Sequence, residues 1–141
     1  MAWIVLGLFV VARKLEDLAV WQLASEVAAR TLAFSATDVI RQEYKFRSQL
    51  ESAARSVPAN VAEGFARFKP REFARFLRYA RGSAAELEVY LDEAAARHWI
   101  DDSEAAAIRL LIRRFSACSA RLTRYLESAE PPNHAGAERT K

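Results

Sequence analysis

The sequence predicts an all-α protein folded as an antiparallel up-down-up-down four-helix bundle. Of its 141 residues, 52% are apolar, and glycine and proline number only four each. Alanine, leucine, arginine and glutamate, which are good helix formers, dominate the rest. Apolar residues recur at spacings of three and four in four segments, and no alternating strand pattern competes. Because short connections make consecutive helices antiparallel neighbours, the four segments predict this bundle.

The first two predicted helices are separated by the break "FSATD", where Thr37 or Asp38 can cap the second. The first runs from about Leu15 to Phe34, and the second ends near Gly64. The apolar positions of the first are Leu18, Trp21, Leu23 or Ala24, Val27 and Thr31. Those of the second are Phe46, Leu50, Ala53, Val57 and Val61.

The last two predicted helices follow the breaks "RFKP" and "HWIDDSE". Pro70 suits the first turn of the third helix, which ends near His98. Asp101, Asp102 or Ser103 can cap the fourth. The apolar positions of the third are Phe73, Phe76, Leu77, Ala80, Leu87, Leu91 and Ala94. Those of the fourth are Ala105, Ile108, Leu111, Ile112, Phe115, Leu122 and Leu126.

The two ends of the chain differ from this pattern, so a single bundle domain is expected over 14–128. The opening "MAWIVLGLFVVA" is shorter than the roughly 20 apolar residues of a spanning helix. It also lacks the basic region and cleavage site of a signal peptide. We expect 1–13 to be an apolar extension, either from a misplaced start or non-essential. The alternatives are a hydrophobic plug or partner-binding segment and, more weakly, a membrane attachment. The polar stretch 129–141 is expected to be a disordered tail. A single cysteine, Cys118, suits a reducing, cytoplasmic setting.

Charge is segregated along the chain. Ten basic and four acidic residues lie between Arg41 and Arg81, whereas seven acidic residues and Arg97 lie between Gly82 and Glu104. In the predicted topology, the end of the second helix, the start of the third and the end of the fourth meet at one end of the bundle. We call the basic residues expected there and along the fourth helix the arginine pole: Arg67, Lys69, Arg71, Arg75, Arg78, Arg81, Arg113, Arg114, Arg121 and Arg124. Arginine suits bidentate phosphate contacts, so RNA or DNA is a candidate partner.

The stretch "SVPANVAEG" interrupts the second helix with a proline. Pro58 removes one backbone hydrogen bond and should kink the helix. At about 100° per residue, polar side chains fall on one flank of the apolar stripe, where they can contact a neighbouring helix or subunit. These residues are Gln49, Ser56, Asn60, Glu63 and Arg67.

Enzymatic machinery is not evident, and no metal or cofactor is expected. The Glu-x-x-His motif of di-iron bundles is missing, because Ala95 lies three residues before His98. Cys118 is at a core position of the fourth helix, which favours a buried thiol over a nucleophile. The cluster Glu86, Glu88, Asp92 and Glu93 contains no histidine and is interpreted as a solvated acidic face.

The run from Ser56 to Leu91, with "SVPANVAEG", "EFARFL" and "GSAAEL", resembles the 23S rRNA intervening-sequence (S23 ribosomal) proteins. That family includes the accessory protein of diversity-generating retroelements. Upstream, "KLEDLAVWQLASEVA" and "YKFRSQLESAARS" are also similar, so the resemblance covers roughly residues 14–127.

The resemblance implies a non-enzymatic bundle that assembles as a homo-oligomer, often a pentamer. It also implies a basic surface that engages RNA or DNA, in retroelements together with a reverse transcriptase. On that basis Arg67, Arg75, Arg78 and Arg81 would contact phosphates. The residues that would maintain the kinked helix and its packing are Ser56, Pro58, Asn60, Glu63 and Gly64.

Two positions depart from the family pattern, and an alternative function stays open. Ala66 replaces a usual glycine, and Lys69 replaces a serine that would cap the third helix, which weakens that helix start by roughly 1 kcal/mol. The alternative is an assembly scaffold without nucleic-acid binding. Its candidate subunit contacts are Trp21, Phe65, Phe68, Tyr79, Tyr90 and Trp99.

Overall fold

The computed structural model describes residues 14–128, so the predicted extension 1–13 and tail 129–141 lie outside it. All secondary structure in the described part is helical, which confirms the predicted class and the four long helices. A short 3₁₀ turn precedes the first of them. The elements are η1 (Leu15–Asp17), α1 (Ala19–Ser35), α2 (Asp38–Gln42), α3 (Tyr44–Ala66), α4 (Pro70–Ala96) and α5 (Asp102–Ser128).

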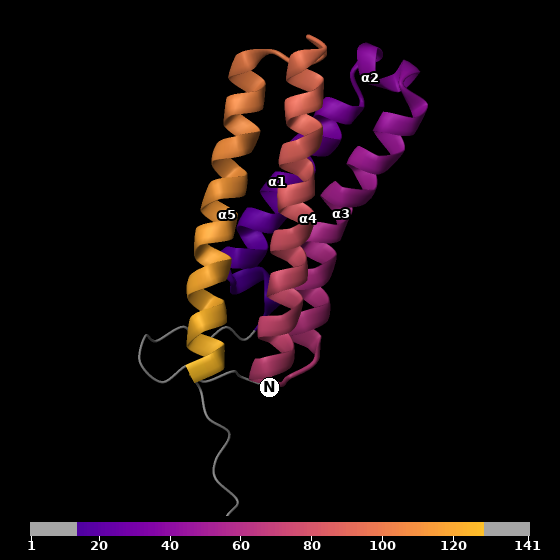
Figure 1. Ribbon diagram of the computed structural model, residues 1–141. Coiled ribbons are helices and arrows are strands. Elements are labelled where there is room, and N and C mark those ends of the chain that lie inside the picture. Colours follow the sequence, from indigo (N-terminus) through magenta and orange to yellow (C-terminus); the bar gives the residue numbers. More distant parts are fainter. Residues whose placement is uncertain (1–13, 129–141) are drawn as a thin grey trace, which may run out of the picture.

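The four long helices lie side by side. Helix α3 packs against α4, α4 against α5, and α1 against both α3 and α5. Figure 1 shows that α3 ends, α4 begins and α5 ends at one end of the molecule, while α2 and the α4–α5 connection lie at the other. The connections that return the chain are short, as the sequence predicts.

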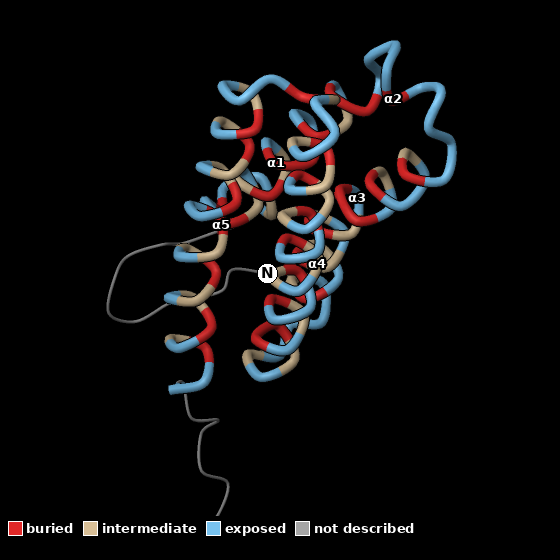
Figure 2. Tube along the Cα trace, turned by 45° about the horizontal axis from the view of Figure 1, so that its top comes forward, coloured by how far each residue is buried: buried red, intermediate tan, exposed pale blue. Residues whose placement is uncertain are grey.

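The core runs along the centre of this arrangement. Figure 2 shows buried residues on the helix sides that face one another and exposed residues on the outside. Large side chains with no accessible surface come from α3, α4 and α5, and α1 contributes smaller ones. Burying each large apolar side chain stabilises the fold by about 2 kcal/mol. These side chains include Leu50, Leu77, Leu87, Leu91, Ile108 and Phe115.

The second predicted helix is not continuous, and this part of the prediction is wrong. The chain breaks at Glu43, whose φ of −92° and ψ of 67° are not helical, and the break separates α2 from α3. At 100° per residue, a continuous helix would turn Ile40 about 120° away from Phe46 and the core. The break lets both be buried, and Ile40 is fully so. The apolar stripe predicted for this helix began at Phe46, so it did not show that Ile40 must also be buried.

The "SVPANVAEG" segment lies within α3, which continues through Pro58 and curves along its length in Figure 1. Asn60 Nδ2 donates to the Ser56 carbonyl oxygen at 2.8 Å and to Ser56 Oγ at 3.0 Å. Ser83 Oγ of α4 also donates to Ser56 Oγ, at 2.8 Å. The polar flank predicted on this helix therefore contacts a neighbouring helix through Ser56.

Gly64 allows α3 and α4 to approach closely. A Cβ at this position would come within 2.7 Å of Phe76 Cβ and 2.8 Å of Phe73 Cδ2. Both phenylalanines belong to the first turns of α4. The glycine of the motif thus fixes how closely the start of α4 packs on the end of α3.

Candidate functional site

Apart from Arg113 and Arg114, the arginine pole is spread over the end of α3, the first half of α4 and the last third of α5. Figure 1 shows that these three stretches lie at the same end of the molecule. Nine of its ten side chains are exposed, and Arg81 is half-buried. Arg113 and Arg114 lie farther from this end, near the middle of α5.

A groove of about 430 Å³ opens on this end, and its lining residues are Arg71, Arg75, Arg78 and Glu127. The three arginines share one outward face of α4, because they are three and four residues apart. Glu127 comes from the last turns of α5. The groove is therefore lined by three guanidinium groups and one carboxylate, and its net positive charge suits an anion with several oxygen acceptors.

Three arginines of the pole are engaged by carboxylates. Arg67 donates to Glu63 at 2.7 Å, and Arg75 donates to Glu72 at 3.1 Å. Arg78 pairs across the helices with Glu127. All six side chains are at least one-third exposed, so these pairs are weak and a phosphate can replace the carboxylate. Lys69, Arg71 and Arg124 form no ion pair within residues 14–128.

Two aromatic rings of α4 support Arg67, at the end of α3, and Arg75. The Arg67 and Arg75 guanidinium carbons lie 5.2 and 5.4 Å from the centre of the Phe76 ring. Arg75 also lies 5.9 Å from the centre of the Tyr79 ring. Cation–π contact at these distances holds the guanidinium groups against the surface while their edges stay in water.

Arg81 differs from the other members of the pole. Its Nη1 donates to Ser119 Oγ at 3.0 Å and to Thr123 Oγ1 at 2.9 Å, and both acceptors are buried on α5. Burial, and then the charge of Arg78, lower the pKa of Arg81. Its guanidinium thus joins α4 to α5, a role that the sequence pattern did not indicate.

The start of α4 lacks a capping side chain, as predicted from Lys69, which stands where the family pattern has a serine. Lys69 is the N-cap residue and makes no side-chain capping bond, and Pro70 occupies the first turn. Phe68, just before it, has a positive φ of 55°. The amide groups of the first turn therefore point toward the basic end of the bundle without a side-chain acceptor from Lys69.

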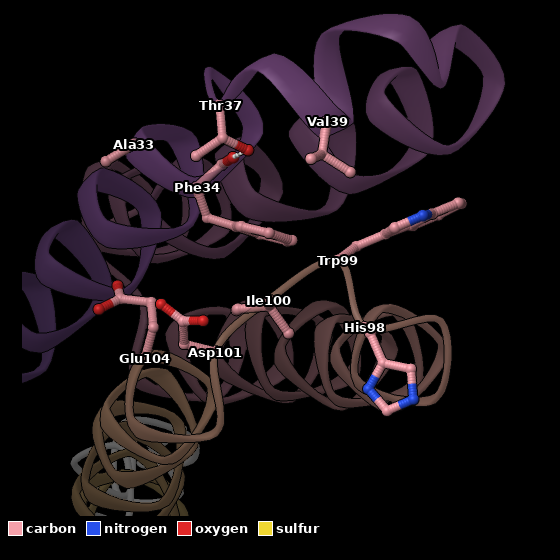
Figure 3. Close-up of a pocket in the computed structure, with 9 residues that line it drawn as sticks. All are labelled: Ala33, Phe34, Thr37, Val39, His98, Trp99, Ile100, Asp101 and Glu104. Atoms are coloured by element: carbon pink, nitrogen blue, oxygen red, sulfur yellow. Dashed lines mark hydrogen bonds between the residues drawn. The ribbon is translucent and has the colours of Figure 1, made fainter.

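The opposite end of the molecule has a second hollow, of about 410 Å³. Figure 3 shows its lining, with the Phe34 and Trp99 rings on its apolar side and the Asp101 and Glu104 carboxylates at one edge. Glu104 accepts two hydrogen bonds from Arg30, at 3.0 and 3.1 Å, and this lowers its pKa. The His98 imidazole points away from Phe34. An acidic edge disfavours phosphate, which distinguishes this hollow from the groove on α4.

A metal site, a reactive thiol and a membrane-spanning helix find little support within the described residues. No cluster of three or more His, Cys, Asp or Glu side chains there is arranged to hold a metal ion. Cys118 is partly rather than fully buried; burial raises the pKa of its thiol, against the opposing effect of Arg121. No helix in this part of the chain combines the length and hydropathy that a bilayer crossing requires.

Comparison with known proteins agrees with the resemblance seen in the motifs. A comparison with curated proteins gives no match. The sequence model of the 23S rRNA-intervening sequence protein family matches residues 16–120, which includes α1 to α4 and most of α5. The chain therefore belongs to the 23S rRNA-intervening sequence protein family.

Proposed function

We propose that this chain is a non-enzymatic, antiparallel up-down-up-down helical bundle that binds RNA through the phosphate backbone, at the nine exposed residues of the arginine pole. Ribosomal RNA is the proposed target class, since the family is named for a ribosomal RNA insertion. The proposal includes a cytoplasmic location and assembly into a homo-oligomer such as a pentamer. A reverse transcriptase is a further proposed partner only through the resemblance to retroelement accessory proteins.

The groove lined by Arg71, Arg75 and Arg78 is the observation that carries the proposal. Three exposed guanidinium groups on one helix face offer bidentate donors to the oxygen acceptors of a phosphate backbone. An oligomer would repeat the groove in every subunit and so strengthen a weak field. Binding of this kind depends on salt and reads little base sequence.

An assembly scaffold that binds no nucleic acid is the alternative. Exposed apolar side chains on α4 and α5 favour it, chiefly Val89 and Leu110, which are 63% and 41% exposed. Among the subunit contacts expected from the sequence, Phe68 and Tyr79 are exposed, whereas the others pack partly against the core. Both functions can coexist only if RNA binding and assembly use different faces.

Reversing two charges at the pole tests the proposal. Arg71→Glu with Arg124→Glu changes two exposed side chains that form no ion pair within residues 14–128. We expect at least about a tenfold loss of affinity for a labelled ribosomal RNA fragment. We also expect the salt slope, which is the slope of log affinity against log salt concentration, to be smaller in magnitude by about two units. Fluorescence anisotropy across a titration measures both quantities.

The matched control makes the same change of net charge at the other end of the molecule. Arg41→Glu with Lys45→Glu alters two exposed residues near the α2–α3 break. This control should bind RNA far better than the variant at the pole. Equal affinities of the two variants, with the oligomer intact by light scattering, would remove the arginine pole as the binding surface.

A further inference from the structure

A half-exposed tyrosine lies beside the arginine groove. Tyr79 is 51% exposed on α4, one turn after Arg75. Arg75 belongs to both features, because it lines the groove and also lies over the Tyr79 ring. A nucleic-acid backbone held in the groove would therefore pass beside the Tyr79 ring.

The surroundings of Tyr79 leave room for a second flat group. Its ring meets that of Phe76 at 86°, with centres 5.6 Å apart, so the two rings do not stack on one another. The Arg75 guanidinium, at 5.9 Å, is near the outer limit of a cation–π contact. A Cβ added at Gly82, three residues farther along the helix, would meet no atom within 4 Å, so the surface beyond the tyrosine is open.

This combination is typical of surfaces that bind single strands. Such surfaces place aromatic rings beside cations, so that a base stacks while its phosphate is held. In a duplex the bases are stacked internally, and only unpaired bases can reach a side chain on a convex helix. A second copy of the chain that met this patch with the same face would bring like charges together at Arg75 and Arg78, which disfavours that occupant.

We propose that the pole recognises unpaired RNA, with the backbone in the Arg71, Arg75 and Arg78 groove and one base stacked on Tyr79. This rests on the proposed RNA-binding function and narrows its target from RNA in general to loops, bulges and single strands. It predicts that the protein distinguishes RNA by secondary structure and not by sequence.

The test compares two labelled RNAs of equal length, a single-stranded pyrimidine oligonucleotide and a blunt duplex. Tyr79→Ala should weaken binding of the single strand about tenfold and leave the duplex unchanged. Tyr79→Phe, which keeps the ring, should restore the single-strand affinity. Tyr44→Ala is the control, because Tyr44 is 83% exposed at the start of α3, at the opposite end of the molecule. The salt slope should be the same for wild type and Tyr79→Ala.

Two results of the affinity comparison would overturn the inference while sparing the proposed function. One is an equal loss on both RNAs, and the other is no loss on either, provided that the Arg71→Glu and Arg124→Glu variant still weakens binding. A change of oligomeric state in Tyr79→Ala would assign the tyrosine to a subunit contact and also overturn the inference. If the charge reversal has no effect on either RNA, the proposed function itself has failed.

Discussion

Replacing Gly64 by alanine is expected to lower the free energy of unfolding by about 1–2 kcal/mol. The added methyl group would come within 2.7 Å of Phe76 Cβ, an atom fixed to the α4 backbone, and within 2.8 Å of Phe73 Cδ2. Relieving such overlap moves the helices apart and costs about 1–3 kcal/mol, sometimes more. This outweighs the gain of up to about 1 kcal/mol in helix propensity. Urea denaturation at one fixed protein concentration measures the difference.

Gly82 supplies the matched control on the neighbouring helix. Its added Cβ would meet nothing within 4 Å, so Gly82→Ala should gain about 0.5–1 kcal/mol from helix propensity alone. The two substitutions are chemically identical, but they should change the free energy of unfolding in opposite directions. A neutral or stabilising Gly64→Ala would show that α3 and α4 are not packed as closely as described.

Replacing Arg81 by methionine is expected to destabilise the fold by about 2 kcal/mol without weakening RNA binding. The change removes the donor shared by Ser119 Oγ and Thr123 Oγ1, both buried. Thr123 Oγ1 still donates to the Ser119 carbonyl oxygen, but Ser119 Oγ loses the guanidinium that it accepts from, and a buried polar group without its partner costs about 1–3 kcal/mol. Methionine retains the length of the apolar stem. Denaturation measures the stability, and the salt dependence of RNA affinity measures the number of phosphate contacts.

The Arg81 result separates a structural role from a binding role. If the Arg81 guanidinium bound a phosphate, its removal would reduce the salt slope by about one unit. Unchanged stability together with a smaller slope would place Arg81 among the binding residues, as the resemblance implied. Arg71→Met is the comparison, because Arg71 is exposed and should show the reverse pattern.

The long helices could be predicted from the sequence because their apolar spacing is strong and their breaks contain proline, serine or aspartate. The break at Glu43 could not, since "RQEYK" contains no residue that stops a helix. It exists because Ile40 and Phe46 both reach the core, and this is decided by packing between helices. The motif also marked Gly64, but the reason for a glycine there is visible only in its distance from Phe76.

The candidate site was predictable in position and less so in its interactions. The spacing of Arg71, Arg75 and Arg78 indicates their common outward face, and all three are exposed. Glu63 lies four residues before Arg67 and Glu72 three before Arg75, so the sequence spacing alone could have indicated those pairs. The contacts of Arg78 with Glu127 and of Arg81 with Ser119 could not be predicted, because they depend on how α4 and α5 are aligned.

The central claim is that the arginine pole binds RNA phosphates, and a salt series on the wild-type protein tests it most directly. The measurement is the affinity for a structured ribosomal RNA fragment, and then for an unrelated RNA, over a range of salt concentrations. We predict a log–log slope of several units that is similar for both RNAs. Absence of binding even at low salt would contradict the claim and favour the assembly scaffold, with the arginines as solvated surface.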